Sequence, residues 1–214
     1  AAGVMSRLLQ KADVFIENFR PRTADRLGLG YHALSPINPR LVYCSISAFG
    51  QSGPYVDKPG FDTLGQAMSG LLSLLSDPDD PKVMGMAVSD YVTGLSAGYG
   101  ILGALMAREK SGRGSRLETS LLQATLSFIG ETAAGYLRTG NVPNRMARVR
   151  NAHAFAFVCK DGRPLAIHCS VPEKFWQALL KSCGRVDLTM DERFNTREAR
   201  RENYELLEQI LAPT

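Results

Sequence analysis

The chain has 214 residues, of which 44% are hydrophobic, so it can bury a sizeable core and form one large domain, or one domain with a small appendage. Its 25 Lys and Arg residues nearly balance 21 Asp and Glu residues, which excludes a polycationic nucleic-acid-binding protein but leaves room for local basic groups that hold a phosphorylated small molecule. The longest apolar passage, residues 94–107, is too short and too glycine-rich to span a bilayer, so neither nucleic acid nor a membrane is expected as a partner.

The cysteines and histidines are scattered along the chain. No two cysteines form a CxxC pair, and no Cys/His cluster has the spacing of a zinc site, so we expect no metal. Free thiols in a reducing compartment are the simplest interpretation, which predicts a cytoplasmic protein. The sequence shows no signal peptide and begins Ala-Ala-Gly, so we expect a fragment or a processed product.

The first fifty residues predict alternating helices and strands. Residues 1–12 carry apolar residues on one helical face, and residues 14–19 form a short apolar strand. Thr23 can cap a short helix that ends near Gly28, and residues 41–49 are rich in strand-forming types. This order is typical of half of a doubly wound α/β sheet, in which ligands bind beyond the carboxyl ends of the strands.

Polar side chains follow both predicted strands, at residues 17–20 and 47–50. Arg20, Arg22 and Arg26 lie close together in the sequence, and guanidinium groups bind phosphate well. The alternative interpretation is a solvated basic helix face. From the residues alone we favour that alternative.

The stretch from Val83 to Lys110 is predicted to be organised around Asp90. Residues 83–88 are an apolar run that predicts a short strand, and a helix follows from Ser89-Asp90 onward. At such a strand-to-helix corner the helix dipole favours a carboxylate, which is then a candidate nucleophile. Considered alone, the stretch favours the simpler role of Ser89 or Asp90 as a helix cap.

Two helical stretches are unusually rich in small residues. Residues 61–75 have helical spacing with small side chains that indicate close packing against another element. The helix after Asp90 contains glycines, each of which costs about 1 kcal/mol relative to alanine in a helix interior. We expect helix–helix packing there, with ligand approach as an alternative near the first of them; these glycines are Gly94, Gly98, Gly100 and Gly103.

The second half of the sequence indicates a separate smaller unit. A strand at 116–120 and a helix at 120–137 complete the first part, and an arginine-rich loop at 139–153 is interpreted as a linker. A β-hairpin with its turn at Asp161-Gly162 follows. Two helices come after it: one opens at Pro172-Glu173 and runs through Leu180, and the other spans 197–212.

Several motifs together resemble one family, in the order in which that family has them. They are ADVFIENFRP (12–21) with Arg26, YCSISAFGQSGPY (43–55), GFDTLGQAMSG (60–70), SDYVTG (89–94), ALMAREKSGRG (104–114), and KDGRPLAIHC (160–169) with FWQAL (175–179). This ordered set resembles the family III CoA-transferases.

The resemblance implies an α/β fold in which residues 1–140 are a Rossmann-like, CoA-binding large domain that is incomplete at its N-terminus. Residues 141–153 are then the linker, and residues 154–214 belong to an incomplete small α/β domain. It also implies an interlocked homodimer that acts on acyl-CoA and small carboxylic acids, with CoA as a substrate and no permanently bound cofactor.

The resemblance places the nucleophile of the family on Asp90, where it would carry CoA as an aspartyl-CoA intermediate while backbone N–H groups at the helix start stabilise oxyanions. The CoA-contacting residues of the family fall on two segments of this chain. They are Asn18, Phe19, Arg20 and Arg26, and then Pro59, Gly60, Phe61 and Asp62.

Two other functions are weighed against transfer. The related alpha-methylacyl-CoA racemases have Gly-His-Asp where this chain has Gly60-Phe61-Asp62, and racemisation needs a base on each face of the carbon, so the absent histidine favours transfer. A truncated CoA-binding or structural domain without turnover is the second alternative. The glycine-rich loop of formyl-CoA transferase has no counterpart around residues 149–157, which argues against formate–oxalate chemistry and leaves the acid open.

Overall fold

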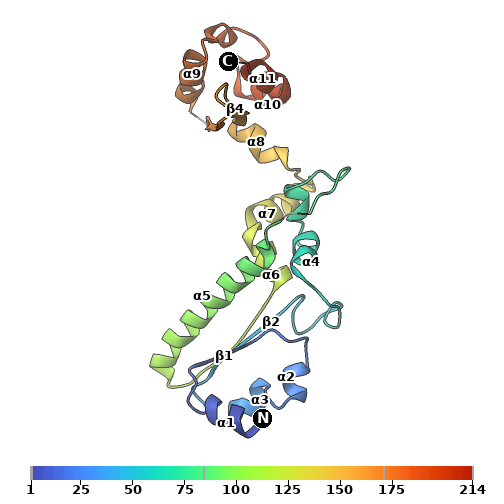
Figure 1. Ribbon diagram of the computed structural model, residues 1–214, viewed down its shortest axis with the longest axis vertical. Helices are drawn as coiled ribbons and strands as arrows, with labels where there is room; N and C mark the ends of the chain where they lie inside the picture. The colour runs from blue at the N-terminus through green and yellow to red at the C-terminus, as the bar shows by residue number, and fades with distance from the viewer. Residues whose placement is uncertain (1, 84, 171, 214) are drawn as a thin grey trace. The chain divides into compact units, whose positions relative to one another are not determined.

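The computed structural model describes residues 2–83, 85–170 and 172–213 (Figure 1). It confirms a mixed α/β protein and divides the chain into two compact units, Ala1–Val142 and Pro143–Thr214, called unit 1 and unit 2 below.

Unit 1 is built on a three-stranded parallel sheet. Its strands are β1 (Val14–Glu17), β2 (Val42–Ser47) and β3 (Arg116–Ser120), in the order β1-β2-β3. Three of the four strands predicted for this part of the chain are therefore present, and because they run parallel their carboxyl ends meet at one edge. β2 is the central strand and is almost entirely buried, as its run of β-branched, aromatic and small residues predicts.

Helices cover the sheet of unit 1. Those before β2 are α1 (Ala2–Leu9), α2 (Thr23–Arg26) and α3 (Tyr31–Leu34); those after it are α4 (Asp62–Met68), the 3₁₀ turn η1 (Leu72–Leu74), α5 (Val88–Ser111), α6 (Leu121–Phe128) and α7 (Gly130–Thr139). α2 begins after Arg22, so Thr23 is its first residue and not its cap. Leu9 of α1 and Leu34 of α3 pack with Tyr43 of β2 in one core cluster. The long α5, green in Figure 1, contacts β2 and β3.

The prediction of a strand at residues 83–88 is wrong. Val83 and residues 85–87 are irregular, Met84 lies outside the described residues, and Val88 is already the first residue of α5. Val83 and Met86 are 72% and 59% exposed, so this apolar run is neither paired in a sheet nor buried. A short apolar run without alternation predicts burial but cannot by itself supply the neighbouring strand that a strand needs.

The two small-residue helices differ in their surroundings. A Cβ added at Gly65 of α4 would lie 2.9 Å from the Cβ of Ser89 and 3.0 Å from that of Leu121, so the close packing predicted for this stretch is confirmed. In α5 the described residues of this chain do not supply the predicted packing at three of the four glycines. A Cβ at Gly94, Gly98 or Gly103 would meet no atom of the described residues within 4 Å.

Unit 2 consists of a hairpin and helices around an aromatic core. The hairpin strands, β4 (Ala154–Val158) and β5 (Pro164–His168), are antiparallel, and Gly162 adopts the positive φ of 80° that the predicted turn requires. The helices are α8 (Met146–Ala152), α9 (Glu173–Ser182), the 3₁₀ turn η2 (Val186–Thr189), α10 (Arg197–Glu202) and α11 (Tyr204–Leu211). The core cluster is Phe155, Trp176, Leu180, Leu188, Phe194, Tyr204, Leu207 and Leu211.

Three predictions for the second half need correction. The arginine-rich stretch interpreted as a loop contains α8, which contacts β4 and α10 and belongs to unit 2. The helix predicted at 197–212 is divided at Asn203, whose side-chain amide donates to the Ala199 carbonyl 3.0 Å away and so competes with the helical hydrogen bonds. The helix predicted at 120–137 is likewise divided, at Ile129.

Candidate active site

A cavity of about 560 Å³ lies at the edge of unit 1 where the parallel strands end. It is lined by residues that follow β1, β2 and β3, by the loop before α4, and by the first turn of α5. The lining residues are Asn18, Phe19, Arg20, Pro21, Ile46, Ser47, Ala48, Lys58, Pro59, Gly60, Phe61, Asp62, Asp90 and Leu121. This is the edge at which open α/β sheets bind their ligands.

Asp90 lies in the first turn of α5 and lines this cavity. Its backbone N–H donates to the Oδ1 atom of Asp62, 3.1 Å away, so a carboxylate from α4 binds the start of α5. The N-cap residue is Ala87, and the capping role expected of Ser89 or Asp90 therefore belongs to Asp62. Burial, and secondly the negative charge of Asp62, raise the pKa of the Asp90 carboxyl. This is the opposite direction to the one expected from the helix dipole alone.

Ser89 fixes the position of the residue that follows it. Its side chain is fully buried, and its Oγ accepts a 2.8 Å hydrogen bond from the Thr125 hydroxyl of α6. The Thr93 hydroxyl donates to the Ser89 carbonyl at 2.6 Å. Gly65 of α4 packs directly against Ser89, so three helices meet there. Asp90 is therefore attached to one of the most tightly packed points of unit 1.

A smaller cavity of about 280 Å³ adjoins the first, because Arg20, Pro21 and Lys58 line both. Arg26 lines the smaller one, and its guanidinium donates to the Thr23 hydroxyl at 2.9 Å. Arg20, Arg26 and Lys58 thus form a basic wall that can hold phosphate groups.

The loop before α4 lies directly on the end of β2. A Cβ at Gly60 would be 2.3 Å from the Cβ of Ala48, so only glycine allows this approach. The next residue, Phe61, is the N-cap residue of α4, and its ring is 77% exposed at the cavity. Phe19, on the other wall, is 40% exposed. The two exposed rings can stack with or shield a planar group.

The model of one protein family, CoA-transferase family III, matches residues 1–214. This chain belongs to that family.

Curated relatives of this family III chain are named as CoA-transferases. It is 38% identical to an acetyl-CoA:oxalate CoA-transferase from Acetobacter aceti, a match that covers 97% of this chain and 54% of the relative. It is 39% identical to a succinate–glutarate CoA-transferase from Agrobacterium fabrum, over 70% of this chain and 37% of the relative. A solved CaiB/BaiF family protein from Brucella suis is 35% identical with a TM-score of 0.84, covering 99% and 56% of the two chains. The chain spans about half the length of these relatives.

The structure brings together nearly all of the residues that the resemblance to family III predicted for the site. Asp90, residues 18–20 and residues 59–62 line the larger cavity. Arg26 lines only the smaller, adjoining cavity. Their roles stay predictions.

Two residues near the site were not predicted. Lys58 carried only the weak signal of a single lysine in a glycine- and proline-rich loop. Glu17 was noted as a polar strand end, but nothing in its local sequence indicated that its carboxylate would be buried.

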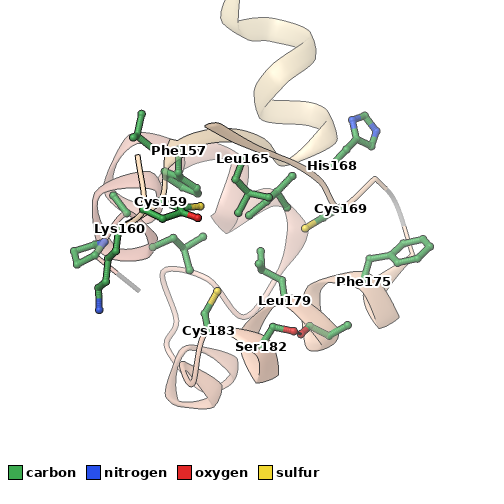
Figure 2. A pocket seen from close by; sticks show the side chains of 17 residues that line it. Phe157, Cys159, Lys160, Leu165, His168, Cys169, Phe175, Leu179, Ser182 and Cys183 are labelled. Atoms are coloured by element: carbon green, nitrogen blue, oxygen red, sulfur yellow. Dashed lines mark hydrogen bonds between the residues drawn. The ribbon is translucent and has the colours of Figure 1, made fainter. Parts of the chain in front are cut away.

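A larger cavity, of about 780 Å³, lies within unit 2 between the hairpin, α9 and the end of α11 (Figure 2). Figure 2 shows the sulfur atoms of Cys169 and Cys183 turned toward this space and His168 pointing away from it. Burial raises the pKa of the Cys169 thiol, which keeps it in the less reactive protonated form. Size alone would favour this cavity, but the carboxylate and basic groups of the predicted site converge on the cavity of unit 1.

The described ranges of the chain contain no group of three His, Cys, Asp or Glu side chains placed to hold a metal ion. In the same ranges, no helix is both long and apolar enough to cross a membrane.

Proposed function

We propose that the protein transfers CoA from an acyl-CoA thioester to a free carboxylic acid through a covalent aspartyl-CoA intermediate on Asp90. The observation that carries this proposal is the shared cavity, in which the Asp90 carboxylate faces the same space as the segments 18–20 and 59–62. A carboxylate at the end of a nucleotide-sized basic cleft is the arrangement that nucleophilic attack on a bound thioester needs.

The reaction proceeds in four balanced steps. An Asp90 carboxylate oxygen attacks the thioester carbonyl, the C–S bond breaks, and a mixed anhydride and CoA thiolate form. The thiolate attacks the aspartyl carbonyl of the anhydride, which releases the donor acid as its carboxylate and leaves an aspartyl-CoA thioester. The acceptor carboxylate attacks this thioester and forms a second anhydride and thiolate. The thiolate then attacks the acceptor acyl carbon, giving the new acyl-CoA and restoring Asp90.

The raised pKa of Asp90 suits this role once the group is ionised, because a more basic carboxylate is a stronger nucleophile. The backbone N–H groups at the helix start are less available to an oxyanion than the sequence indicated. Those of Val88, Asp90 and Tyr91 already donate to the Met86 carbonyl, to Asp62 and to the Ala87 carbonyl. Positive charge from Arg20 and Lys58, which line the same cavity as Asp90, is a second source of stabilisation.

The acid substrates are proposed to be small dicarboxylates, with succinyl-CoA or acetyl-CoA as donor. Relatives are named for oxalate and glutarate as the acid, and two further relatives, 32% and 34% identical to this chain, for citramalate and malate. Because one relative is named for oxalate with acetyl-CoA, oxalate belongs among the acids to be tested.

Neither racemisation nor CoA binding without turnover has support from the relatives described above, which are named as transferases.

We also propose a cytoplasmic homodimer, for which the resemblance and the four free cysteines are the support. The face of α5 that carries Leu95, Tyr99, Leu102 and Met106 is more than 60% exposed at each position, as a surface covered by a second subunit would be.

The test uses the full-length protein with succinyl-CoA or acetyl-CoA and a panel of carboxylic acids, and mass spectrometry identifies each new acyl-CoA. With a donor alone, intact-protein mass spectrometry should detect CoA attached to the wild-type chain but not to Asp90→Ala. Alanine is used because an asparagine can deamidate back to aspartate. Substantial turnover by Asp90→Ala would overturn the proposed mechanism, and CoA binding without exchange in the wild type would favour a binding protein without turnover.

A further inference from the structure

Glu17 is a buried carboxylate at the carboxyl end of β1, directly before the segment that lines the candidate site. The residue is 7% exposed. Its Oε2 atom accepts a hydrogen bond from the backbone N–H of Phe19 at 2.8 Å, and its Oε1 atom accepts a short one from the Ser45 hydroxyl. These two donors are uncharged, although burying a carboxylate is costly. The Tyr43 side chain on β2 is also buried, and this burial and, secondly, the negative charge of Glu17 raise the pKa of its phenol.

The network continues from Glu17 to the second wall of the cavity. Ser45 Oγ accepts a hydrogen bond from the side-chain amide of Gln51 at 2.8 Å. Gln51 lies in the loop that leads to Pro59 and Phe61, which line the cavity opposite Phe19. One carboxylate thus connects the chain after β1 with the loop after β2.

Both donors to Glu17 have little freedom to turn elsewhere. The Phe19 N–H belongs to the backbone and cannot rotate away from its acceptor. The Ser45 Oγ already accepts from Gln51, which leaves its hydroxyl proton to donate to Glu17. The two groups therefore require two acceptor atoms at Glu17, which a carboxylate supplies through its two oxygens.

We infer that Glu17 is a positioning residue for CoA: it holds the Phe19 main chain so that Asn18, Phe19 and Arg20 face the cavity, and it aligns this wall with the Gln51 loop. The inference rests on the proposed function, since it assumes that CoA occupies this cavity. Glutamine cannot replace the carboxylate fully. If its oxygen accepts from Phe19, its NH₂ group faces the Ser45 hydroxyl, which then loses its acceptor.

The experiment compares Glu17→Gln with wild type and with Glu109→Gln in the full-length protein. Glu109 is the matched control, because its side chain is 71% exposed on α5 and it does not line the cavity. It pairs with Arg40 at 3.4 Å and, more distantly, with the buried Arg108 at 3.9 Å. CoA affinity is measured by calorimetry, and KM and kcat by the transfer assay. Glu17→Gln should weaken CoA binding and raise KM by about tenfold. Its kcat at saturating substrate should stay within about twofold, because Asp90 is held separately by Ser89 and Asp62.

A purely structural role would instead lower the amount of folded protein without changing the CoA affinity of the folded fraction. Unchanged affinity, or a loss in kcat with unchanged KM, would overturn the inference. If Glu17→Gln does not fold, Gln51→Ala tests the same network from the loop, and an affinity loss of about threefold is expected. Wild-type CoA affinity for Gln51→Ala would then overturn the inference.

The inference and the proposed function can fail separately. If the wild type binds CoA but transfers nothing, the proposed function fails while the affinity comparison still tests Glu17. If the wild type transfers CoA and Glu17→Gln binds it normally, only the inference fails.

Discussion

Adding one methyl group at Gly65 should destabilise unit 1 and disturb the site, because this glycine lies at the point where α4, α5 and α6 meet. The new Cβ would be 2.9 Å from both Cβ and Oγ of Ser89 and 3.0 Å from Cβ of Leu121. Unstrained carbon contacts are about 3.5–4.0 Å, so these neighbours must move by about half an ångström or more. Ser89 cannot move without straining its bond to Thr125.

The expected cost follows from three opposing contributions. Overpacking a well-packed core costs about 1–3 kcal/mol, and weakening the buried Ser89–Thr125 hydrogen bond adds about 1 kcal/mol. Alanine is the better helix former by about 1 kcal/mol, which offsets part of this. The net loss for Gly65→Ala is therefore about 1–3 kcal/mol. The control is Gly98→Ala in α5, which should gain about 1 kcal/mol because the described residues leave space around it.

The assay is urea unfolding of the 214-residue chain, followed by two probes that separate the units. The single tryptophan is Trp176, in the core of unit 2, so its fluorescence reports that unit. Far-UV circular dichroism reports both units. Gly65→Ala should lower the dichroism midpoint and leave the fluorescence transition unchanged. Wild-type stability for Gly65→Ala would refute the reasoning, and destabilisation by Gly98→Ala would show that another surface covers this side of α5.

Three further predictions concern ionisable side chains. Asp62→Asn removes a negative charge that is the second cause, next to burial, of the raised pKa of Asp90. The acid limb of the pH profile of kcat, measured on the full-length protein, should therefore move to lower pH, and an unmoved limb would contradict the assignment of Asp90 as the ionising nucleophile. Arg108→Met should destabilise unit 1 by about 1–3 kcal/mol in unfolding followed by circular dichroism, because the buried guanidinium donates to two main-chain carbonyls and to the Asp13 carboxylate. Unchanged stability would contradict a stabilising role for these hydrogen bonds. Burial raises the pKa of Tyr204 from 10.0 to about 12, so the phenol of the unfolded chain ionises at lower pH than that of the folded chain. Unit 2 should therefore lose stability as the pH rises from about 10 to 12. A stability that stays constant over this range, measured by tryptophan fluorescence, would argue against a buried Tyr204.

The strands and the location of the site could be predicted because their signals are local. Residues 14–19 and 41–49 are rich in strand-forming types, and polar residues follow each of them. Parallel strands place their carboxyl ends together, so segments distant in sequence were expected at one edge, and Asn18 and Ala48 do line one cavity. The strand predicted at 83–88 was wrong, because its apolar residues indicate burial without indicating a partner.

The direction of the Asp90 pKa shift could not be predicted, because it depends first on burial in the folded chain and secondly on Asp62, a residue 28 positions away. From the sequence Asp90 has only its helix, whose dipole lowers the pKa of a carboxyl group in the first turn. In the folded chain Asp62 binds that helix start and places a second negative charge beside it. The same holds for the α5 glycines, whose spacing indicates close packing but does not identify what packs against them.

The sequence by itself determined the alternation of helices and strands, the edge at which a ligand can bind, and the family, since each is recorded in residue types at neighbouring positions. Only the tertiary structure decided which carboxylates do which work: Asp62 binds the start of α5, Asp90 opens into the cavity, and Glu17 is buried beneath its wall. The physical reason is that the ionisation and hydrogen bonding of a carboxylate depend on the donors and charges within a few ångströms, and folding brings those together from distant parts of the chain.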